Sequence, residues 1–92
     1  MKNIQKSKSL IFGIIGYGSI GKVHEKILKE LGYKIYIYDP IFKKKKNFLP
    51  LKIINEICNV IIVASPSSTH IKYLKFFADK KKHIFVEKPF SH

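Results

Sequence analysis

The 92-residue chain has no arginine, no tryptophan, a single cysteine and only six acidic residues. One cysteine, Cys58, excludes an intrachain disulfide and a cysteine-based zinc site, and no metal site is predicted. Because Cys58 lies in an apolar stretch, we interpret it as an inert packed thiol. This cysteine usage fits a reducing compartment, and we expect a cytoplasmic protein.

All 18 basic side chains are lysine, and they give a formal net charge of +12. A charge of this size favours nucleic-acid binding through neutralised phosphates. Proteins that read specific nucleic-acid sequences, however, rely on the planar fork of arginine, which lysine cannot replace. A nucleic-acid partner is therefore the weaker alternative, and the lysine run at residues 43–46 is interpreted as a solvated surface.

Long apolar runs are also missing. No stretch without a charged residue, the one at residues 9–21 included, reaches the roughly 18–20 apolar residues of a membrane span, so no membrane partner is expected. Residues 1–9 are polar and basic and show no signal-peptide cleavage pattern. We expect a disordered basic tail at residues 1–9 and one small domain at residues 10–92.

The chain does contain an alternation of apolar strands with amphipathic helices. Apolar and β-branched runs predict about five strands, at residues 10–15, 33–38, 51–54, 60–64 and 83–86, the third of them very short. Helices are predicted between the first and second strands and between the last two. This order predicts an α/β fold with a doubly wound parallel sheet, in which ligands bind at the carboxyl end of the first strand.

Helical spacing also predicts which side chains face the core. In the first helix, which starts at Ser19 and has Gly32 as its C-cap, the expected buried residues are Ile20, Val23, Ile27 and Leu31. Glu25 and the lysines of that helix are expected to face away from the core. In the second helix, capped by Ser68 or Thr69, the expected buried residues are Ile71, Leu74, Phe77 and Ala78.

The first predicted strand ends in a glycine-rich turn, Gly16-Tyr17-Gly18-Ser19-Ile20-Gly21, and a helix follows at once. Gly16 suits a tight turn, Gly18 lets the backbone approach phosphates, and Gly21 lets the helix pack against the strand. The helix N-terminus offers unpaired N–H groups and a positive dipole end to an anion. We predict that this loop binds the pyrophosphate of a dinucleotide in a Rossmann-like domain.

Asp39 lies 18 residues past Gly21, at the end of the second predicted strand. A carboxylate there can accept hydrogen bonds from the adenosine ribose hydroxyls, and it would repel a 2′-phosphate. NAD is therefore the expected cofactor and NADP is disfavoured, although the lysine run beyond Asp39 can soften that preference. The alternative is that Asp39-Pro40 is only a turn.

Two further segments follow predicted strands at the same edge of the sheet: Ser65-Pro66-Ser67-Ser68-Thr69-His70 and Glu87-Lys88-Pro89. A lysine that is desolvated beside a cofactor has a lowered pKa and can move protons. The alternative is a solvated lysine near a chain terminus, and the residues alone leave both interpretations open.

The chain resembles the Gfo/Idh/MocA family of oxidoreductases in four places. These are Gly16-x-Gly18-x-x-Gly21-x-x-His24, the strand end at Asp39, Ala64-Ser65-Pro66 with His70, and His83-Ile84-Phe85-Val86-Glu87-Lys88-Pro89. The resemblance covers about residues 10–90, and the Glu-Lys-Pro element is its most specific part.

The resemblance implies a role for each predicted site residue. The glycine loop, with Tyr17, Ser19 and Ile20, would bind the pyrophosphate, and Asp39 the ribose. The nicotinamide side would be bordered by Ser65, Pro66, Ser67, His70, Glu87 and Lys88. Lys88 is the predicted catalytic residue beside the substrate hydroxyl, Glu87 and Pro89 would shape its turn, and His24 is interpreted as structural. The implied reaction is NAD-linked oxidation or reduction at a hydroxyl carbon of a sugar, cyclitol or nucleotide-sugar.

The chain also departs from the family pattern. Family members carry a further α+β domain for the substrate, and the stretch between Asp39 and Val60 is short here. Lys81 replaces the usual glycine, which would strain a left-handed backbone by roughly 1 kcal/mol. We therefore expect an incomplete, truncated domain that binds NAD without turnover on its own. The alternative is a non-catalytic remnant or a binding module that needs a separate partner chain. An exposed sheet edge would favour association, including a homo-oligomer.

Overall fold

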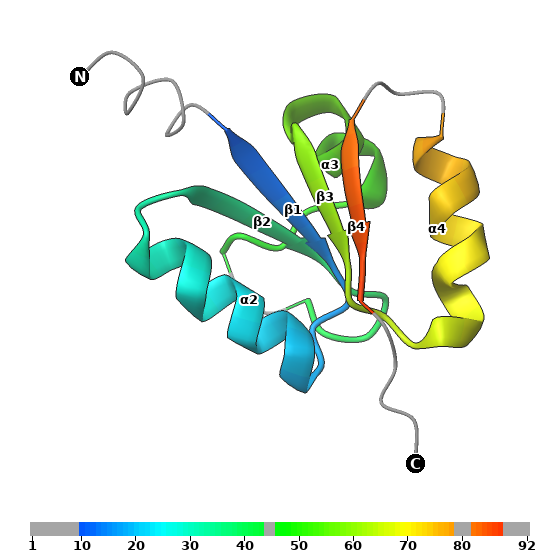
Figure 1. The fold of residues 1–92 in the computed structure, drawn as a ribbon, viewed down its shortest axis with the longest axis horizontal. Coiled ribbons are helices and arrows are strands. Elements are labelled where there is room, and N and C mark those ends of the chain that lie inside the picture. The colour runs from blue at the N-terminus through cyan, green and yellow to red at the C-terminus, as the bar shows by residue number, and fades with distance from the viewer. Residues whose placement is uncertain (1–9, 44–45, 79–81, 88–92) are drawn as a thin grey trace.

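The computed structural model describes residues 10–43, 46–78 and 82–87 (Figure 1). The predicted tail, the predicted strain at Lys81 and the predicted catalytic residue Lys88 lie outside the described residues. The elements in chain order are β1 Ile11–Ile15, α2 Ser19–Glu30, β2 Lys34–Tyr38, α3 Leu51–Ile57, β3 Val60–Val63, a 3₁₀ turn Ser67–Thr69, α4 His70–Phe77 and β4 His83–Val86. None of the helices among these residues is long and apolar enough to cross a membrane.

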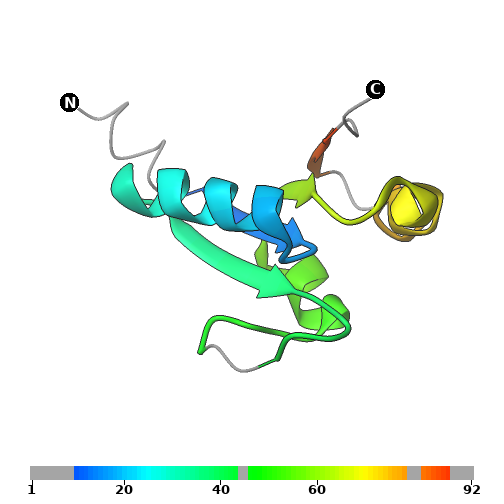
Figure 2. The same cartoon turned by 90° about the horizontal axis from the view of Figure 1, so that it is seen from below.

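The strands form one parallel sheet in the order β2-β1-β3-β4. The chain leaves β1 toward β2 on one side and later adds β3 and β4 on the other, which is the doubly wound order. Figure 2 shows α2 on one side of the sheet and α3 on the other, and the core contacts place α4 on the same side as α3. The predicted α/β fold is therefore confirmed, with four strands in the described part of the chain.

Helices on both faces bury both sides of the central strands β1 and β3. The core cluster on the α3 and α4 side contains Ile15, Ile54, Cys58, Ile61, Val63, Tyr73 and Phe77. The cluster on the α2 side contains Ile14, Tyr17, Leu28, Ile35, Ile37 and Ile62. Successive residues of one strand, such as Ile14 and Ile15, belong to opposite clusters because strand side chains alternate between the two faces.

Cys58 is 1% exposed. Burial raises the pKa of its thiol to about 11, while the nearby Lys82 ammonium acts in the opposite direction. The thiol therefore stays protonated at neutral pH, which agrees with the inert packed cysteine predicted from the sequence.

Gly32 ends α2 as predicted. Its φ is 90°, a left-handed conformation that glycine adopts without strain. The Gly32 N–H donates to the Lys29 carbonyl oxygen, and the Tyr33 N–H donates to the Leu28 carbonyl oxygen, both at 3.0 Å. This pair of bonds is the Schellman motif, and it satisfies carbonyls that the helix end would otherwise leave unpaired.

The face that α2 buries differs from the predicted face. Three apolar side chains expected in the core are about half exposed: Val23 (54%), Ile27 (48%) and Leu31 (56%). The buried residues are Gly21, Glu25 and Leu28, which have the same helical spacing. The helix is rotated so that Gly21 faces the sheet, because a Cβ at this position would lie only 2.2 Å from the Gly16 carbonyl oxygen and only glycine fits there.

Glu25, predicted to face solvent, is 4% exposed and holds a buried polar network. It accepts a hydrogen bond from the Tyr17 hydroxyl at 2.6 Å and one from the Asn47 side-chain amide at 3.1 Å. Lys29 lies 3.5 Å from the same carboxylate. Burial of a carboxylate is tolerated only when such partners replace water. Asn47 also belongs to the segment beside β2, because its carbonyl oxygen accepts the Ile37 N–H at 2.9 Å.

Residues 51–54, predicted as a very short strand, are the first part of helix α3. Pro50 precedes the helix in an extended conformation, and Ile54 is fully buried. Ile54 approaches the sheet at Gly13, where a Cβ would lie 2.8 Å from its Cγ2 atom. A run of so few apolar residues fits a strand or one turn of helix equally well, so the pattern could not decide between them.

The buried stripe of α4 also differs from the prediction. Phe77 is fully buried as expected, but its partner is Tyr73, while Ile71 is 67% and Leu74 37% exposed, and Ala78 is exposed as well. Tyr73 packs edge-on against Tyr38, with ring centroids 6.2 Å apart. Figure 2 shows α4 at the β4 margin of the sheet, and a helix at a margin buries a narrow stripe.

The observed buried face of α4 leads to a prediction about stability. We expect Phe77→Ala to lower the free energy of unfolding by about 3–5 kcal/mol, because it removes a fully buried ring and leaves a cavity. Ile71→Ala, on the exposed face of the same helix, should change it by no more than about 0.5 kcal/mol. Urea unfolding followed by circular dichroism measures both, and equal losses would contradict the observed rotation of α4.

Candidate functional site

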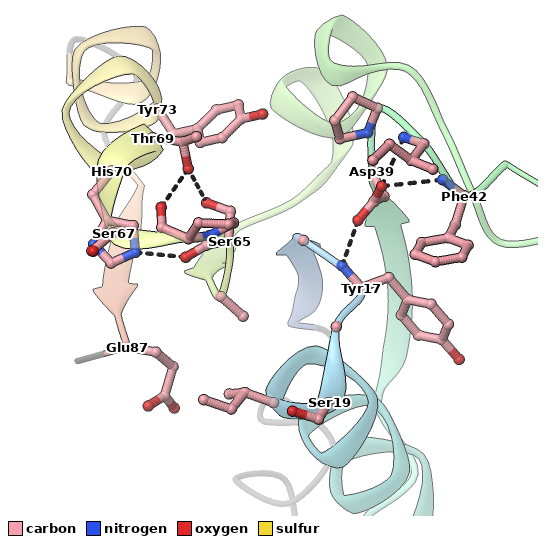
Figure 3. A pocket seen from close by; sticks show the side chains of 17 residues that line it. Tyr17, Ser19, Asp39, Phe42, Ser65, Ser67, Thr69, His70, Tyr73 and Glu87 are labelled. Atoms are coloured by element: carbon pink, nitrogen blue, oxygen red, sulfur yellow. Dashed lines mark hydrogen bonds between the residues drawn. The ribbon is translucent and has the colours of Figure 1, made fainter. Parts of the chain in front are cut away.

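A pocket of about 530 Å³ opens at the carboxyl ends of the strands. Figure 3 shows it between the loops that follow β1 and β2 and the segment that follows β3, with Glu87 at the end of β4. The predicted cofactor residues that line the pocket are Gly16, Tyr17, Gly18, Ser19, Ile20, Asp39, Ser65, Pro66, Ser67, His70 and Glu87. Gly21 packs against the carbonyl of Gly16, and the structure thus gathers four distant segments of the sequence at one edge of the sheet.

Gly16 makes the turn between β1 and the loop. Its φ is 102°, and a Cβ there would lie 2.7 Å from the Ser65 backbone, so a side chain would be both strained and obstructed. The Gly16 N–H donates to the Tyr38 carbonyl oxygen at 2.8 Å, which ties the turn to the end of β2. The predicted tight turn is present, with a hydrogen bond to the end of β2 and the backbone of Ser65 close by.

The space around Gly18 is open, whereas the space around Gly16 is filled by neighbouring backbone. No heavy atom would lie within 4 Å of a Cβ at Gly18, and its φ of −82° is accessible to any residue. Gly18 is also the N-cap of α2, without a side-chain capping bond and without an acidic residue in the first turn. The start of α2 therefore presents its N–H groups and its positive dipole end to the pocket.

Asp39 joins the two loops on the β2 side of the pocket (Figure 3). Its Oδ2 atom accepts the Tyr17 N–H at 2.8 Å, from the glycine loop. Its Oδ1 atom accepts the N–H groups of Ile41 at 2.8 Å and Phe42 at 3.1 Å, from the loop after β2. A carboxylate offers about four acceptor positions, so one remains for a ligand hydroxyl.

These bonds determine the charge of Asp39. Burial by itself raises the pKa of the Asp39 carboxyl. The hydrogen bonds from the backbone N–H groups of Tyr17, Ile41 and Phe42 together outweigh this effect, so the pKa lies below its ordinary value. Asp39 is therefore ionised at neutral pH. A fixed negative charge at this point attracts hydroxyl donors and repels phosphates.

The opposite wall is the segment after β3. The Thr69 hydroxyl donates to the Pro66 carbonyl oxygen at 2.7 Å and lies 2.7 Å from the Ser65 hydroxyl. Thr69 is at the N-cap position of α4 but makes no side-chain capping bond, so the predicted capping role is wrong. His70 Nε2 lies 2.8 Å from the Ser65 carbonyl oxygen and thus braces the same turn. The predicted segment is ordered by its own side chains.

Several pocket residues were missed by the sequence analysis. Ile41 and Phe42 follow Asp39-Pro40 and expose 80% and 52% of their surface, so they offer an apolar platform beside the carboxylate. Their signal was their position directly after Asp39. Tyr73 lines the pocket from α4, and burial, then its neighbours Tyr38 and Asp39, raise its pKa, so its hydroxyl stays protonated. No motif pointed to Tyr73.

Glu87, at the end of β4, lines the pocket and contacts His24 of α2 through a carboxylate oxygen and the imidazole Nε2. His24, interpreted from the sequence as structural, thus connects two segments of the family pattern. Lys88 is the next residue in the chain and lies outside the described residues, so its catalytic role stays a prediction.

The three glycines of the loop should respond differently to alanine. Gly16→Ala and Gly21→Ala should each lower the free energy of unfolding by about 1–3 kcal/mol, because the added Cβ would strain the backbone or overpack the contact. Gly18→Ala should change it by less than about 1 kcal/mol, because its Cβ meets open space. Urea unfolding measures the three variants, and a Gly18→Ala loss as large as that of Gly16→Ala would contradict this account.

The lowered pKa of Asp39 makes its contribution to stability dependent on pH. The contribution is present above the unfolded pKa of about 4 and is lost as the pH falls through the lower folded pKa. The difference in unfolding free energy between wild type and Asp39→Asn should therefore be constant from about pH 7 to 5 and shrink below about pH 4. Urea unfolding at each pH tests this, and a difference that persists unchanged at about pH 2 contradicts it.

Known proteins resemble this chain in sequence and in fold. A family model described as "Oxidoreductase family, NAD-binding Rossmann fold" (Gfo/Idh/MocA) matches residues 10–92. The chain is 31% identical over 99 aligned positions to the uncharacterized oxidoreductase YrbE of Bacillus subtilis, covering 92% of this chain and 29% of YrbE. It is 37% identical over 73 positions to erythronate-4-phosphate dehydrogenase of Wigglesworthia glossinidia brevipalpis, covering 76% of this chain and 19% of that enzyme.

Among solved structures, the chain resembles UDP-N-acetylglucosamine 3-dehydrogenase GnnA from Acidithiobacillus ferrooxidans, with a TM-score of 0.76 at 18% sequence identity. The alignment covers 90% of this chain and 30% of GnnA, and a second crystal form of GnnA gives a TM-score of 0.75. The chain thus spans less than a third of the length of these relatives. Because the family model matches most of the chain, the protein belongs to the Gfo/Idh/MocA oxidoreductase family, and its residues 10–92 correspond to that family's NAD-binding Rossmann fold.

Proposed function

We propose that the chain binds NAD in preference to NADP, as the cofactor-binding part of an oxidoreductase that acts on a hydroxyl carbon of a sugar, cyclitol or nucleotide-sugar. The observation that carries the choice of NAD is Asp39. Its carboxylate is ionised, is fixed by three backbone N–H groups and faces the pocket between the two loops. A 2′-phosphate beside this charge would be repelled, whereas a 2′-hydroxyl can donate to it.

The pocket residues fit a dinucleotide along its length. The open space at Gly18 and the uncapped start of α2 suit a pyrophosphate. Asp39 would hold the adenosine ribose, with the apolar surface of Ile41 and Phe42 beside it for the adenine. Since β2 and β4 lie on opposite sides of β1, a dinucleotide with its adenosine at β2 directs its nicotinamide toward β3 and β4.

The nicotinamide, when bound, supplies the hydride acceptor or donor. The chain's own residues would position it and move the accompanying proton. Lys88 directly follows Glu87, which lines the pocket, and we propose that its amine orients the substrate hydroxyl and exchanges a proton with it. Ser67 and His70 would border the same side. The named activity of GnnA, on a nucleotide-sugar, falls within the proposed substrate class.

A binding module that needs a second polypeptide is the other candidate. Apolar side chains are exposed on the outer side of α2 and on the edge strand β4, among them Val23 (54%), Ile27 (48%) and Phe85 (60%). Surfaces of this kind are favoured sites of association, with a partner chain or with a second copy. In this case the substrate contacts would come from the partner, and the cofactor contacts would be the same as above.

Titration calorimetry with NAD⁺ and NADP⁺ tests the proposed cofactor. We expect wild type to bind NAD⁺ more tightly than NADP⁺. Asp39→Asn should weaken the affinity for NAD⁺ about tenfold or more, because it replaces a charge-assisted hydrogen bond worth about 1.5–3 kcal/mol. It should also reduce the difference between the affinities for NAD⁺ and NADP⁺.

Glu56→Gln is the matched control, since it removes an exposed carboxylate from α3 and should leave both affinities within about twofold. Circular dichroism verifies that each variant is folded. Equal binding of both dinucleotides by wild type, unaltered by Asp39→Asn, would overturn the proposal.

A further inference from the structure

Two neighbouring side chains of α2 reach two different sides of the pocket. Glu25 holds the Tyr17 hydroxyl at the loop after β1. His24 contacts the Glu87 carboxylate at the end of β4 through its Nε2 atom. His24 and Glu87 are separated by 63 residues in the sequence, and their side chains are only 27% and 36% exposed. The helix therefore connects the glycine loop to the far end of the sheet.

The strand that precedes Glu87, β4, is largely exposed. β4 is an edge strand, and its residues Phe85 and Val86 are 60% and 37% exposed. Its backbone pairs with β3, and the Glu87 N–H extends this pairing by donating to the Val63 carbonyl oxygen at 3.0 Å. The pairing sets the register of β4, and the side-chain contact with His24 adds a lateral tie to α2.

The position of α2 is itself closely fixed. Gly21 lies against the Gly16 carbonyl, and Glu25 bonds to Tyr17, so the helix cannot shift without moving the glycine loop. A helix is stiff over the few residues from Ser19 to His24. The tie at His24 therefore sets the end of β4 relative to the loop that suits a pyrophosphate.

We propose that His24 is a positioning residue for the β4 side of the pocket. It holds Glu87, directly after β4, at a fixed place relative to the glycine loop. The inference rests on the proposed function, in which the nicotinamide half of the dinucleotide points toward β3 and β4. Loss of the tie should then weaken contacts to the nicotinamide half and spare those to the adenosine half, which lies at β2.

The comparison of two ligands separates this role from a purely structural one. NADH carries both halves of the dinucleotide, whereas ADP-ribose carries the adenosine and the pyrophosphate without the nicotinamide. We expect His24→Leu to weaken NADH binding five- to tenfold in titration calorimetry and to change ADP-ribose binding less than twofold. A contact that only stabilises the fold would change both affinities alike or leave both unchanged.

Three further variants identify the tie as the cause. His24→Gln keeps a side-chain donor and should recover most of the NADH affinity. In a Glu87→Ala background, His24→Leu should have no additional effect, because the pair is already broken. Lys26→Leu is the control, since it places the same side chain on the exposed face of the same helix and should leave both affinities within twofold.

Amide hydrogen exchange gives a readout that does not depend on a ligand. The Glu87 amide should exchange at least fivefold faster in His24→Leu than in wild type, whereas amides of β1 should not change. Unchanged exchange at Glu87, or equal losses of NADH and ADP-ribose affinity, overturns the proposal. If wild type binds neither ligand, the proposed function fails and the positioning role fails with it, while faster exchange would still establish the tie itself.

Discussion

The close approach of Gly21 to the Gly16 carbonyl determines how the rest of the pocket is built. With no side chain at Gly21, α2 lies directly on the turn that ends β1. This contact rotates the helix so that Glu25 points inward and Val23 and Ile27 point outward. Val23 and Ile27 thus stay partly exposed and contribute little hydrophobic stabilisation, while the start of the helix opens onto the pocket, an arrangement that suits an anion.

The buried network around Glu25 and the ionised carboxylate of Asp39 also fix the loops that form the pocket. Asp39 binds backbone N–H groups of the glycine loop and of the segment after β2, and Glu25 binds side chains of the same two segments, Tyr17 and Asn47. Both acidic residues are hydrogen-bonded within the protein before any ligand is present, which keeps the pocket in shape. The large positive charge of the chain is thus compatible with a locally negative position at Asp39, because local hydrogen bonds decide the state of that carboxyl.

The sequence was sufficient to predict the parallel sheet, its switch point and most of the pocket wall. Apolar runs that alternate with helices leave few topologies, and the motif glycines with Asp39 fix where the ligand edge lies. It was insufficient for the faces of α2 and α4, because periodicity gives the spacing of a stripe and tertiary contacts choose among stripes. The helix at residues 51–57 and the pocket residue Tyr73 were missed because a short apolar run and a lone tyrosine have no distinctive local signal.

The network around Glu25 has a consequence for how this protein can change during evolution. Loss of either donor would remove a hydrogen bond from a buried carboxylate, and loss of Glu25 would remove the acceptor that Tyr17 and Asn47 share. We therefore expect these three positions to covary, so that they are either conserved together or substituted together. Their joint variation would trace the history of the scaffold separately from that of the cofactor motif.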